Sequence, residues 1–279
     1  MNYHVFVGAT GNASNGKIGQ FPQDLHVNYR FMLSWMHEQS ITAGSSARFL
    51  DYGCGNGKVV VAARDSGLEC VGAETFYEGH SKVQIEDLKK AGLLGGVVYK
   101  IDGGRLPFPD EFFDGVVSNQ VFEHVVNLNA VLLEIHRVLK PNGRLLSLFA
   151  DSGVVREGHV GVPMAHWFKK GSRLREHYMT VARTLGHGTK LNPGEKPREW
   201  ARRYGYFLDN LTVYRSYHAI RKAYDPLFMT NHVEEEYIRL RLPKASYVLR
   251  IPGMTSLARF AFTKVAGIIM DSKKRNMKY

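Results

Sequence analysis

The sequence predicts an α/β fold in which helices cover both faces of a mostly parallel β-sheet. Between residues 47 and 150, short apolar runs alternate with segments of helical periodicity. This alternation is typical of parallel sheets, because a helix usually connects each strand to the next. The chain has 279 residues, of which 44% are hydrophobic, so it is long and apolar enough to form a large domain with its own core.

The predicted elements follow one another in a regular order up to residue 150. Residues 1–20 are rich in Gly, Asn and Ser and predict a loose N-terminal segment, whereas residues 24–42 have helical spacing. The amphipathic helix over 127–139 should end at Pro141-Asn142-Gly143, because proline cannot continue a helix. The expected strands cover 48–51, 68–73, 97–101, 113–118 and 144–149, and the helices between them cover 58–66, 81–91 and 127–139.

After residue 150 the alternation fades, and the predicted elements are of mixed type. We expect helices over 171–187 and 213–223, late strands over 207–213 and 246–251, and a last helix from about 255 to 270, after the break at Pro252-Gly253. We therefore divide the chain into an N-terminal loop and helix (1–45), a core (46–150) and a C-terminal elaboration (151–279).

The net charge of +11 is concentrated in the second half of the chain. Residues 1–150 hold 13 Lys and Arg against 15 Asp and Glu, whereas residues 151–279 hold 24 against 11. Such a basic surface is either simply solvated or faces an anionic partner, namely a phosphorylated substrate, nucleic acid or a membrane. The apolar segment 255–275 with its cations leaves peripheral membrane contact open, beside packing on the protein itself or on a second subunit in a homo-oligomer.

The composition also predicts what the chain does not contain. Two cysteines, Cys54 and Cys70, exclude a disulfide scaffold and show no metal-type spacing, so we predict no metal site. The first residues lack the basic and apolar regions of a signal peptide, and no stretch approaches the roughly 20 apolar residues of a membrane span. We expect a cytoplasmic protein, with the inner face of the membrane as the alternative location.

A glycine cluster separates the first predicted strand from its helix. It reads Asp51-Tyr-Gly-Cys-Gly-Asn-Gly57, and its glycines permit a tight turn and close approach of a ligand to the backbone. The spacing G-x-G-x-G differs from the G-x-G-x-x-G that grips a pyrophosphate. Asp51 would repel phosphates but suits a cofactor with a cationic amino-acid end, and Glu74 after the next strand can accept hydrogen bonds from ribose hydroxyls.

This cluster resembles motif I of the class I S-adenosylmethionine-dependent methyltransferases. The resemblance covers about residues 46–150, and Val121-Phe-Glu-His-Val125 and the segment 134–143 resemble the small-molecule branch of that superfamily. It implies a Rossmann-like, doubly wound, mostly parallel seven-stranded sheet with a helical C-terminal elaboration. In it, Glu74 would bind the ribose and Asp102 the adenine amine. The resemblance implies that S-adenosylmethionine is bound by Asp51, Gly53, Gly55, Gly57, Glu74, Asp102 and Asn119.

Three histidines are candidates for binding the acceptor or acting as a general base. His124 follows the fourth predicted strand, and His159 and His166 lie in the segment 157–167 after the fifth. Ligands of parallel α/β sheets bind at the carboxyl ends of the strands, so these segments should face the acceptor. For each histidine the alternative is a structural role in its loop, which is also how we interpret Glu123.

The predicted function is methyl transfer to a small-molecule or glycan-precursor acceptor at oxygen, with an anionic or sugar-linked acceptor in view of the basic second half. The alternatives are an RNA methyltransferase, or a non-catalytic protein that binds the cofactor or a membrane. Nucleic acid is disfavoured, because the chain reads Ser118-Asn-Gln-Val121 where enzymes that methylate base amines usually carry Asn/Asp-Pro-Pro-aromatic.

Overall fold

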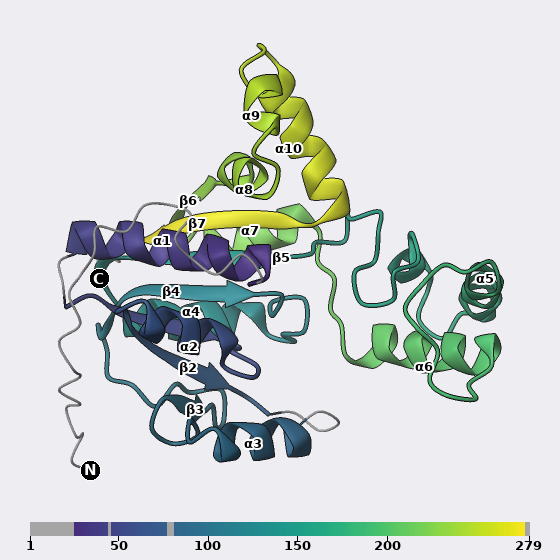
Figure 1. Cartoon of the computed structure of the whole chain (residues 1–279), viewed down its shortest axis with the longest axis horizontal. Helices are drawn as coiled ribbons and strands as arrows, with labels where there is room; N and C mark the ends of the chain where they lie inside the picture. Colours follow the sequence, from purple (N-terminus) through teal and green to yellow (C-terminus); the bar gives the residue numbers. More distant parts are fainter. Residues whose placement is uncertain (1–24, 44–45, 77–80, 277–279) are drawn as a thin grey trace.

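A seven-stranded sheet forms the centre of the computed structural model, which describes residues 25–43, 46–76 and 81–276 (Figure 1). The strand order is β3-β2-β1-β4-β5-β7-β6. The first five strands are parallel, and β7 is antiparallel to both of its neighbours. The strands are β1 (Arg48–Tyr52), β2 (Glu69–Glu74), β3 (Val98–Lys100), β4 (Phe113–Asn119), β5 (Leu139–Phe149), β6 (Phe228–His232) and β7 (Ile268–Lys274). The predicted doubly wound, mostly parallel seven-stranded sheet is confirmed.

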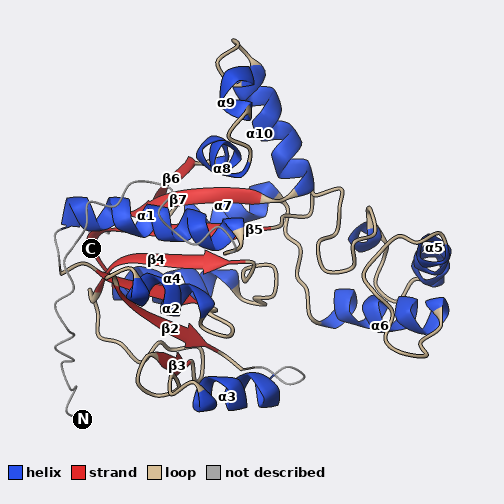
Figure 2. Cartoon of the chain, viewed as in Figure 1, coloured by secondary structure: helices blue, strands red, loops and turns tan. Residues whose placement is uncertain are grey.

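Helices cover both faces of this sheet (Figure 2). One face packs against α1 (Val27–Ala43), α2 (Lys58–Asp65), α3 (Ser81–Lys90) and α8 (Glu234–Arg241) through one buried apolar cluster. The other face packs against α4 (Leu128–Val138) and α7 (Tyr217–Tyr224) through a second cluster. Burial of apolar surface on two faces is the main stabilising contribution in such a three-layer fold.

The elements expected before residue 150 are present, with boundaries that differ by a few residues. The largest difference is β5, which begins at Leu139, directly after α4, rather than at Arg144. Pairing with β4 shifts register between the pairs Phe113–Leu139 and Gly115–Arg144, so the turn residues Pro141-Asn142-Gly143 form a bulge inside the strand. The loose segment predicted for residues 1–20 lies outside the described residues.

The two late strands predicted from sequence are wrong. Residues 207–210 belong to the helix α6 (Pro197–Asn210), because Trp200, Ala201 and Leu208 bury one face of that helix. Residues 245–248 form the short helix α9 (Ala245–Val248). The strands that complete the sheet are instead β6 and β7, so the sheet draws on both the predicted core and the predicted C-terminal elaboration.

The helical part of the elaboration has a small apolar core of its own. It contains α5 (Arg173–Thr184), α6 and the short 3-10 helix η1 (Ala165–Trp167), and lies to one side of the sheet beyond the ends of β4 and β5 (Figure 1). Trp200 and Met179 are fully buried between α5 and α6. Several arginines of this part are neutralised locally, since Arg175 pairs with Asp209 at 2.5 Å and Arg203 with Glu195 at 2.7 Å.

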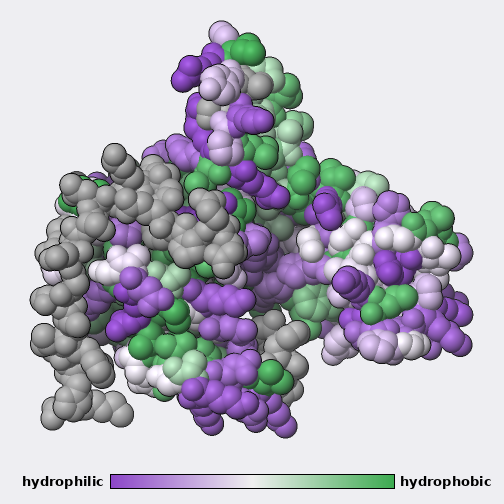
Figure 3. All heavy atoms as spheres, in the orientation of Figure 1, coloured by the Kyte–Doolittle hydropathy of each residue, from purple (hydrophilic) through white to green (hydrophobic). Residues whose placement is uncertain are grey.

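The segment 255–275 does not form one amphipathic helix, which corrects the predicted helix over 255–270. It divides at Gly267 into α10 (Met254–Val265) and the buried strand β7. Lys274 and Arg275 donate hydrogen bonds to the carbonyl oxygens of Leu139 and Phe228, so they are not on a free membrane-facing tail. The helix α10 projects from the sheet beside α9 (Figure 1), with hydrophobic side chains along one edge (Figure 3). Membrane contact through it stays a prediction. Within the described residues, no helix has the length and apolar character needed to cross a membrane.

Candidate cofactor and acceptor site

The strand order creates a crevice between β1 and β4. The chain leaves β1 toward β2 on one side and leaves β4 toward β5 on the other, so the loops that follow these two strands diverge. A cavity of about 440 Å³ lies at this point. It is lined by residues drawn from 26–29, from 51–59 and from the pair Asn119 and Gln120. Asp51, Gly53, Gly55 and Asn119, all predicted to bind the cofactor, line this cavity.

The motif loop has a backbone conformation that requires glycine at Gly53. Gly53 has a φ of 75°, in the left-handed region, and a Cβ at this position would overlap the side chain of Val121. The N–H groups of Gly53 and Cys54 donate to the carbonyl oxygen of Ala73 at 2.8 and 3.2 Å. The loop therefore turns tightly against β2, and it leaves its other side open to the cavity. Gly57, also at positive φ, is the N-cap of α2.

Two buried carboxylates, Asp51 and Glu74, lie beside this loop. Burial raises the pKa of Asp51 to about 7, and the charge of Glu74 adds to the shift. Glu74 accepts hydrogen bonds from the N–H groups of Gly55 (2.9 Å) and Thr75 (2.8 Å). Asp102 is different, since its side chain is 91% exposed and lies 3.8 Å from the Lys100 ammonium. Its role toward an adenine ring stays a prediction.

The N-terminal segment contributes residues to the cavity that the sequence did not identify. The side-chain amide of Asn28 donates to the Asn119 side chain at 2.9 Å, and Asn28 also accepts a hydrogen bond from Tyr237. Burial raises the pKa of Tyr29, and the charge of the nearby Asp51 raises it further. The sequence shows only helical periodicity here, and no spacing indicates that α1 begins at the crevice.

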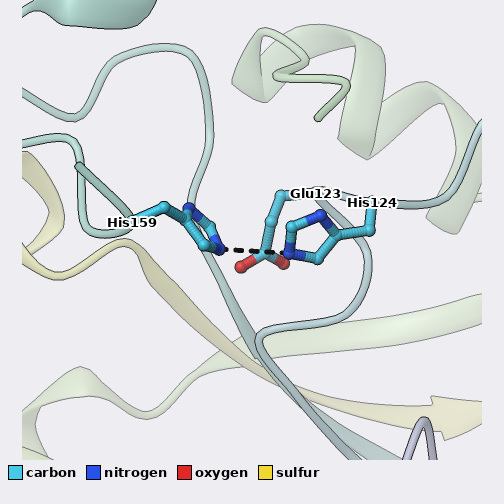
Figure 4. Close-up of side chains that lie close together, drawn as sticks. All are labelled: Glu123, His124 and His159. Atoms are coloured by element: carbon cyan, nitrogen blue, oxygen red, sulfur yellow. Dashed lines mark hydrogen bonds between the residues drawn. The ribbon is translucent and has the colours of Figure 1, made fainter. Parts of the chain in front are cut away.

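His124 and His159 meet at the carboxyl ends of β4 and β5 (Figure 4). Their Nε2 atoms lie 3.1 Å apart. The Nδ1 atom of His124 lies 2.6 Å from the carbonyl oxygen of Leu211, and the Nδ1 atom of His159 lies 2.8 Å from the buried carboxylate of Glu157. His166 is not part of this pair; its ring contacts the ring of Tyr214 at a centroid distance of 4.5 Å.

The surroundings shift the pKa values of this cluster in different directions. Burial lowers the pKa of His124. Burial also acts on His159, but the hydrogen bond and charge of Glu157 outweigh it and raise the pKa of that imidazole. Glu123, which is 1% exposed, has its pKa raised to about 7 by burial. Its two carboxylate oxygens have no hydrogen-bond partner in the described part of the chain.

Arg215 holds the loop that presents these groups, and sequence reasoning did not identify it. Its guanidinium donates to the carbonyl oxygens of Phe122 (3.1 Å) and Val126 (2.8 Å), which lie on either side of His124. The neighbouring residue Val213 donates its N–H to the carbonyl oxygen of Glu123 at 2.6 Å. The segment that enters α7 thus fixes the loop after β4.

Comparisons with known proteins match the central part of the chain to methyltransferases. Residues 50–147 match a family model described as a methyltransferase domain. An uncharacterized methyltransferase of Schizosaccharomyces pombe is 31% identical over 176 residues, which cover 59% of this chain and 58% of the relative. The ubiquinone/menaquinone biosynthesis C-methyltransferase of Pectobacterium carotovorum is 35% identical over 77 residues, 27% of this chain and 31% of the relative. The chain thus spans between about a third and three fifths of the length of these curated relatives.

Among solved structures, an S-adenosylmethionine-dependent methyltransferase from Mesorhizobium loti aligns with a TM-score of 0.49 and 14% identity, over 90% of this chain and 99% of the other. Residues 50–147, which match the methyltransferase domain, contain both the glycine motif that follows β1 and the acid at the end of β2. Residues 50–147 therefore form a methyltransferase domain similar to those of S-adenosylmethionine-dependent methyltransferases.

Proposed function

We propose that this chain transfers the methyl group of S-adenosylmethionine to a small-molecule acceptor, at an oxygen atom. The observation that carries the proposal is the buried Asp51 carboxylate at a cavity in the crevice between β1 and β4. Burial destabilises its ionised form, and a ligand with a cationic end would restore that form. The open backbone of the glycine loop, where a Cβ at Gly53 would overlap Val121, also fits a ligand that approaches closely.

In this proposal the residues of the cavity bind and orient the cofactor. S-adenosylmethionine supplies a methyl group already activated on a sulfonium, so alignment of the acceptor is the main task of the protein. Orientation of this kind can contribute about 7–11 kcal/mol. Asp51 would bind the amino-acid end, Glu74 the ribose and Asp102 the adenine amine, while Asn28 keeps Asn119 in position through their 2.9 Å hydrogen bond.

The histidine cluster supports an oxygen acceptor, because a hydroxyl must lose its proton during methyl transfer. With Nδ1 of His159 tied to Glu157, its Nε2 atom is the one available to a proton or ligand. A positioned base typically contributes about 10²–10⁴-fold to the rate. The ring of His166 contacts the ring of Tyr214. In this proposal His166 would shape the acceptor pocket rather than remove the proton of the acceptor hydroxyl.

Carbon is a second candidate for the methylated atom. The Pectobacterium relative and the sterol 4-C-methyltransferase of Caenorhabditis elegans, which is 28% identical over 109 residues, are both named as C-methyltransferases. An anionic or sugar-linked acceptor remains part of the proposal, although the ion pairs of Arg175 and Arg203 neutralise two of the cations of the basic second half.

Two measurements test the proposal. The first compares the thermal stability of the full chain with S-adenosylhomocysteine and with NAD; saturation at 100 times the dissociation constant should add about 2.7 kcal/mol for the adenosyl ligand alone. The second incubates the chain and donor with labelled methyl groups and a small-molecule extract, and with RNA as a separate acceptor. Label in small molecules supports the proposal, label in RNA replaces it with the alternative, and stabilisation without transfer supports a non-catalytic binding protein.

A further inference from the structure

The hydrogen bonds around His124 and His159 leave two nitrogen lone pairs facing each other. A carbonyl oxygen can only accept, so His124 must carry a proton on Nδ1, where it contacts Leu211. The same argument places a proton on Nδ1 of His159, which donates to the Glu157 carboxylate. When both imidazoles are neutral, each has one N–H, and both Nε2 atoms, 3.1 Å apart, are then unprotonated acceptors. Two lone pairs at this distance repel each other unless a cation binds them.

A buried carboxylate completes the arrangement. Glu123 is 1% exposed, and in the part of the chain described both of its oxygens lack a hydrogen-bond partner. A carboxylate oxygen of Glu123 and one ring nitrogen from each histidine all lie within 4.8 Å of one another. Figure 4 shows the three side chains pointing toward one another. A buried carboxylate without a partner is costly, and native proteins rarely retain one without a ligand or ion.

We propose that Glu123, His124 and His159 bind a divalent transition metal, with Zn²⁺ as the best fit. Two imidazoles and one carboxylate are the donors of many catalytic zinc sites, which keep a further position open. In a tetrahedral site the ligand atoms lie about 3.4 Å from one another. The two histidine nitrogens are already close to this spacing, whereas the Glu123 carboxylate would have to shift by up to about 1.4 Å to reach it. This inference departs from the absence of a metal site predicted by sequence.

The groups around the cluster match the outer shell of a metal site. Histidine ligands of metals usually donate their second N–H to a carboxylate or a backbone carbonyl, which fixes the ring and its tautomer. His159 has the first kind of partner, in Glu157, and His124 has the second, in Leu211. Glu157 is itself held by the hydroxyl of Tyr214 and the N–H of Val160.

A proton shared between the two Nε2 atoms is the competing explanation. It would remove the repulsion of the lone pairs, but it would leave both oxygens of Glu123 without a hydrogen-bond partner. A metal ion engages all three side chains at once. The open coordination position would then take the oxygen of the acceptor and lower the pKa of its hydroxyl. This last role rests on the proposed function, whereas the metal site does not.

The experiment measures metal binding directly, without cofactor or acceptor. The full chain is treated with a chelator, dialysed and titrated with Zn²⁺ against a chromogenic competitor, and Co²⁺ is used as a spectroscopic probe. We expect one Zn²⁺ per chain and Co²⁺ absorption bands typical of nitrogen and oxygen ligands in a four- or five-coordinate site. Loss of one imidazole in His124→Ala or His159→Ala should weaken binding at least 100-fold, and Glu157→Gln should weaken it about 10–100-fold.

His232→Ala provides a matched control. His232 also hydrogen-bonds a buried glutamate two residues later, Glu234, but its Nε2 atom is taken by the hydroxyl of Tyr217 at 2.7 Å. Zinc binding should be unchanged in this variant.

Glu123→Gln keeps the shape of the side chain, so weaker binding with an unchanged melting temperature of the metal-free protein would identify Glu123 as a ligand. Wild-type protein that binds no Zn²⁺, or binding that survives in His124→Ala and His159→Ala, would overturn the proposal. Zinc binding without methyl transfer would count against the proposed function only.

Discussion

Glu74, at the end of β2, accepts a 2.9 Å hydrogen bond from the backbone N–H of Gly55, in the middle of the glycine loop that follows β1. The acid that the sequence assigned to the cofactor ribose therefore also holds the shape of the neighbouring loop. The parallel pairing of β1 with β2 brings the two carboxyl ends together, so that an acid 19 residues along the chain reaches the loop.

Replacement of Glu74 should weaken cofactor binding without unfolding the protein. A hydrogen bond to a charged group contributes about 1.5–3 kcal/mol, so Glu74→Ala should lower the affinity for S-adenosylhomocysteine more than tenfold. Calorimetric titration measures this effect. Glu86→Ala, which removes an exposed acid of α3, is the control and should bind normally. Equal affinity of Glu74→Ala and wild type would contradict the role assigned to Glu74.

Alanine at Gly53 should be more damaging than alanine at a glycine with a similar backbone. Gly53 and Gly92 have φ values of 75° and 66°, but a Cβ at Gly92 meets no atom within 4 Å, whereas one at Gly53 overlaps Val121. Gly92→Ala should cost about 1–2 kcal/mol of unfolding free energy, from backbone strain alone. Gly53→Ala should cost more and abolish stabilisation by S-adenosylhomocysteine.

A double variant tests whether the overlap is the cause. Val121→Ala in the background of Gly53→Ala removes the atoms that the new Cβ would meet. Denaturant unfolding of the single and double variants should show that the second change recovers part of the stability lost by the first. Additive losses would show that Val121 does not limit the space at this position.

The buried carboxyl of Asp51 should make stability and cofactor affinity depend on pH in opposite directions. Its folded-state pKa of about 7 lies above the ordinary value of 3.8. The stability from its protonated form is therefore fully present below about pH 4 and is lost as the pH rises toward 7. Affinity for the cationic cofactor should increase over the same range, because binding favours the ionised carboxylate.

Asp51→Asn isolates this contribution. The variant cannot ionise, so unfolding measured from pH 4 to 8 should lose less stability than in the wild type, and the dependence of cofactor affinity on pH should flatten. Identical pH profiles for the variant and the wild type would show that Asp51 does not titrate in this range.

Removal of an imidazole from the histidine cluster should reduce methyl transfer and spare cofactor binding. His124→Ala and His159→Ala should each lower kcat by about 10²–10⁴-fold, because each removes a group that we propose acts on the acceptor. The affinity for S-adenosylhomocysteine, measured by titration, should stay within a few-fold of wild type. His166→Ala should act mainly on the KM for the acceptor, since His166 contacts Tyr214 rather than the pair. Loss of cofactor affinity in all three variants would instead indicate a general structural role.

The sequence determined the central part of the fold and the cofactor loop, because their signals are local. The strand that contains Asp51, the glycines up to Gly57 and the acid at Glu74 lie close together in the sequence, and their order alone predicts their positions. The late strands could not be predicted in this way. A short apolar run such as the one around Phe207 and Leu208 suits a strand or a buried helix face equally, and packing around Trp200 selected the helix.

Tertiary structure alone decided which residues form the proposed acceptor side of the site. His124 and His159 are separated by 35 residues, and they meet because β4 and β5 are parallel neighbours whose carboxyl ends lie side by side. Arg215, from the segment that enters α7, holds the loop that carries His124. Asn28, in the first turn of α1, reaches Asn119 at the end of β4. No local pattern encodes these contacts, because each depends on how the sheet is ordered and on which helices cover it. The sequence therefore determines where the cofactor loop forms, and the packing of distant segments decides which side chains face it.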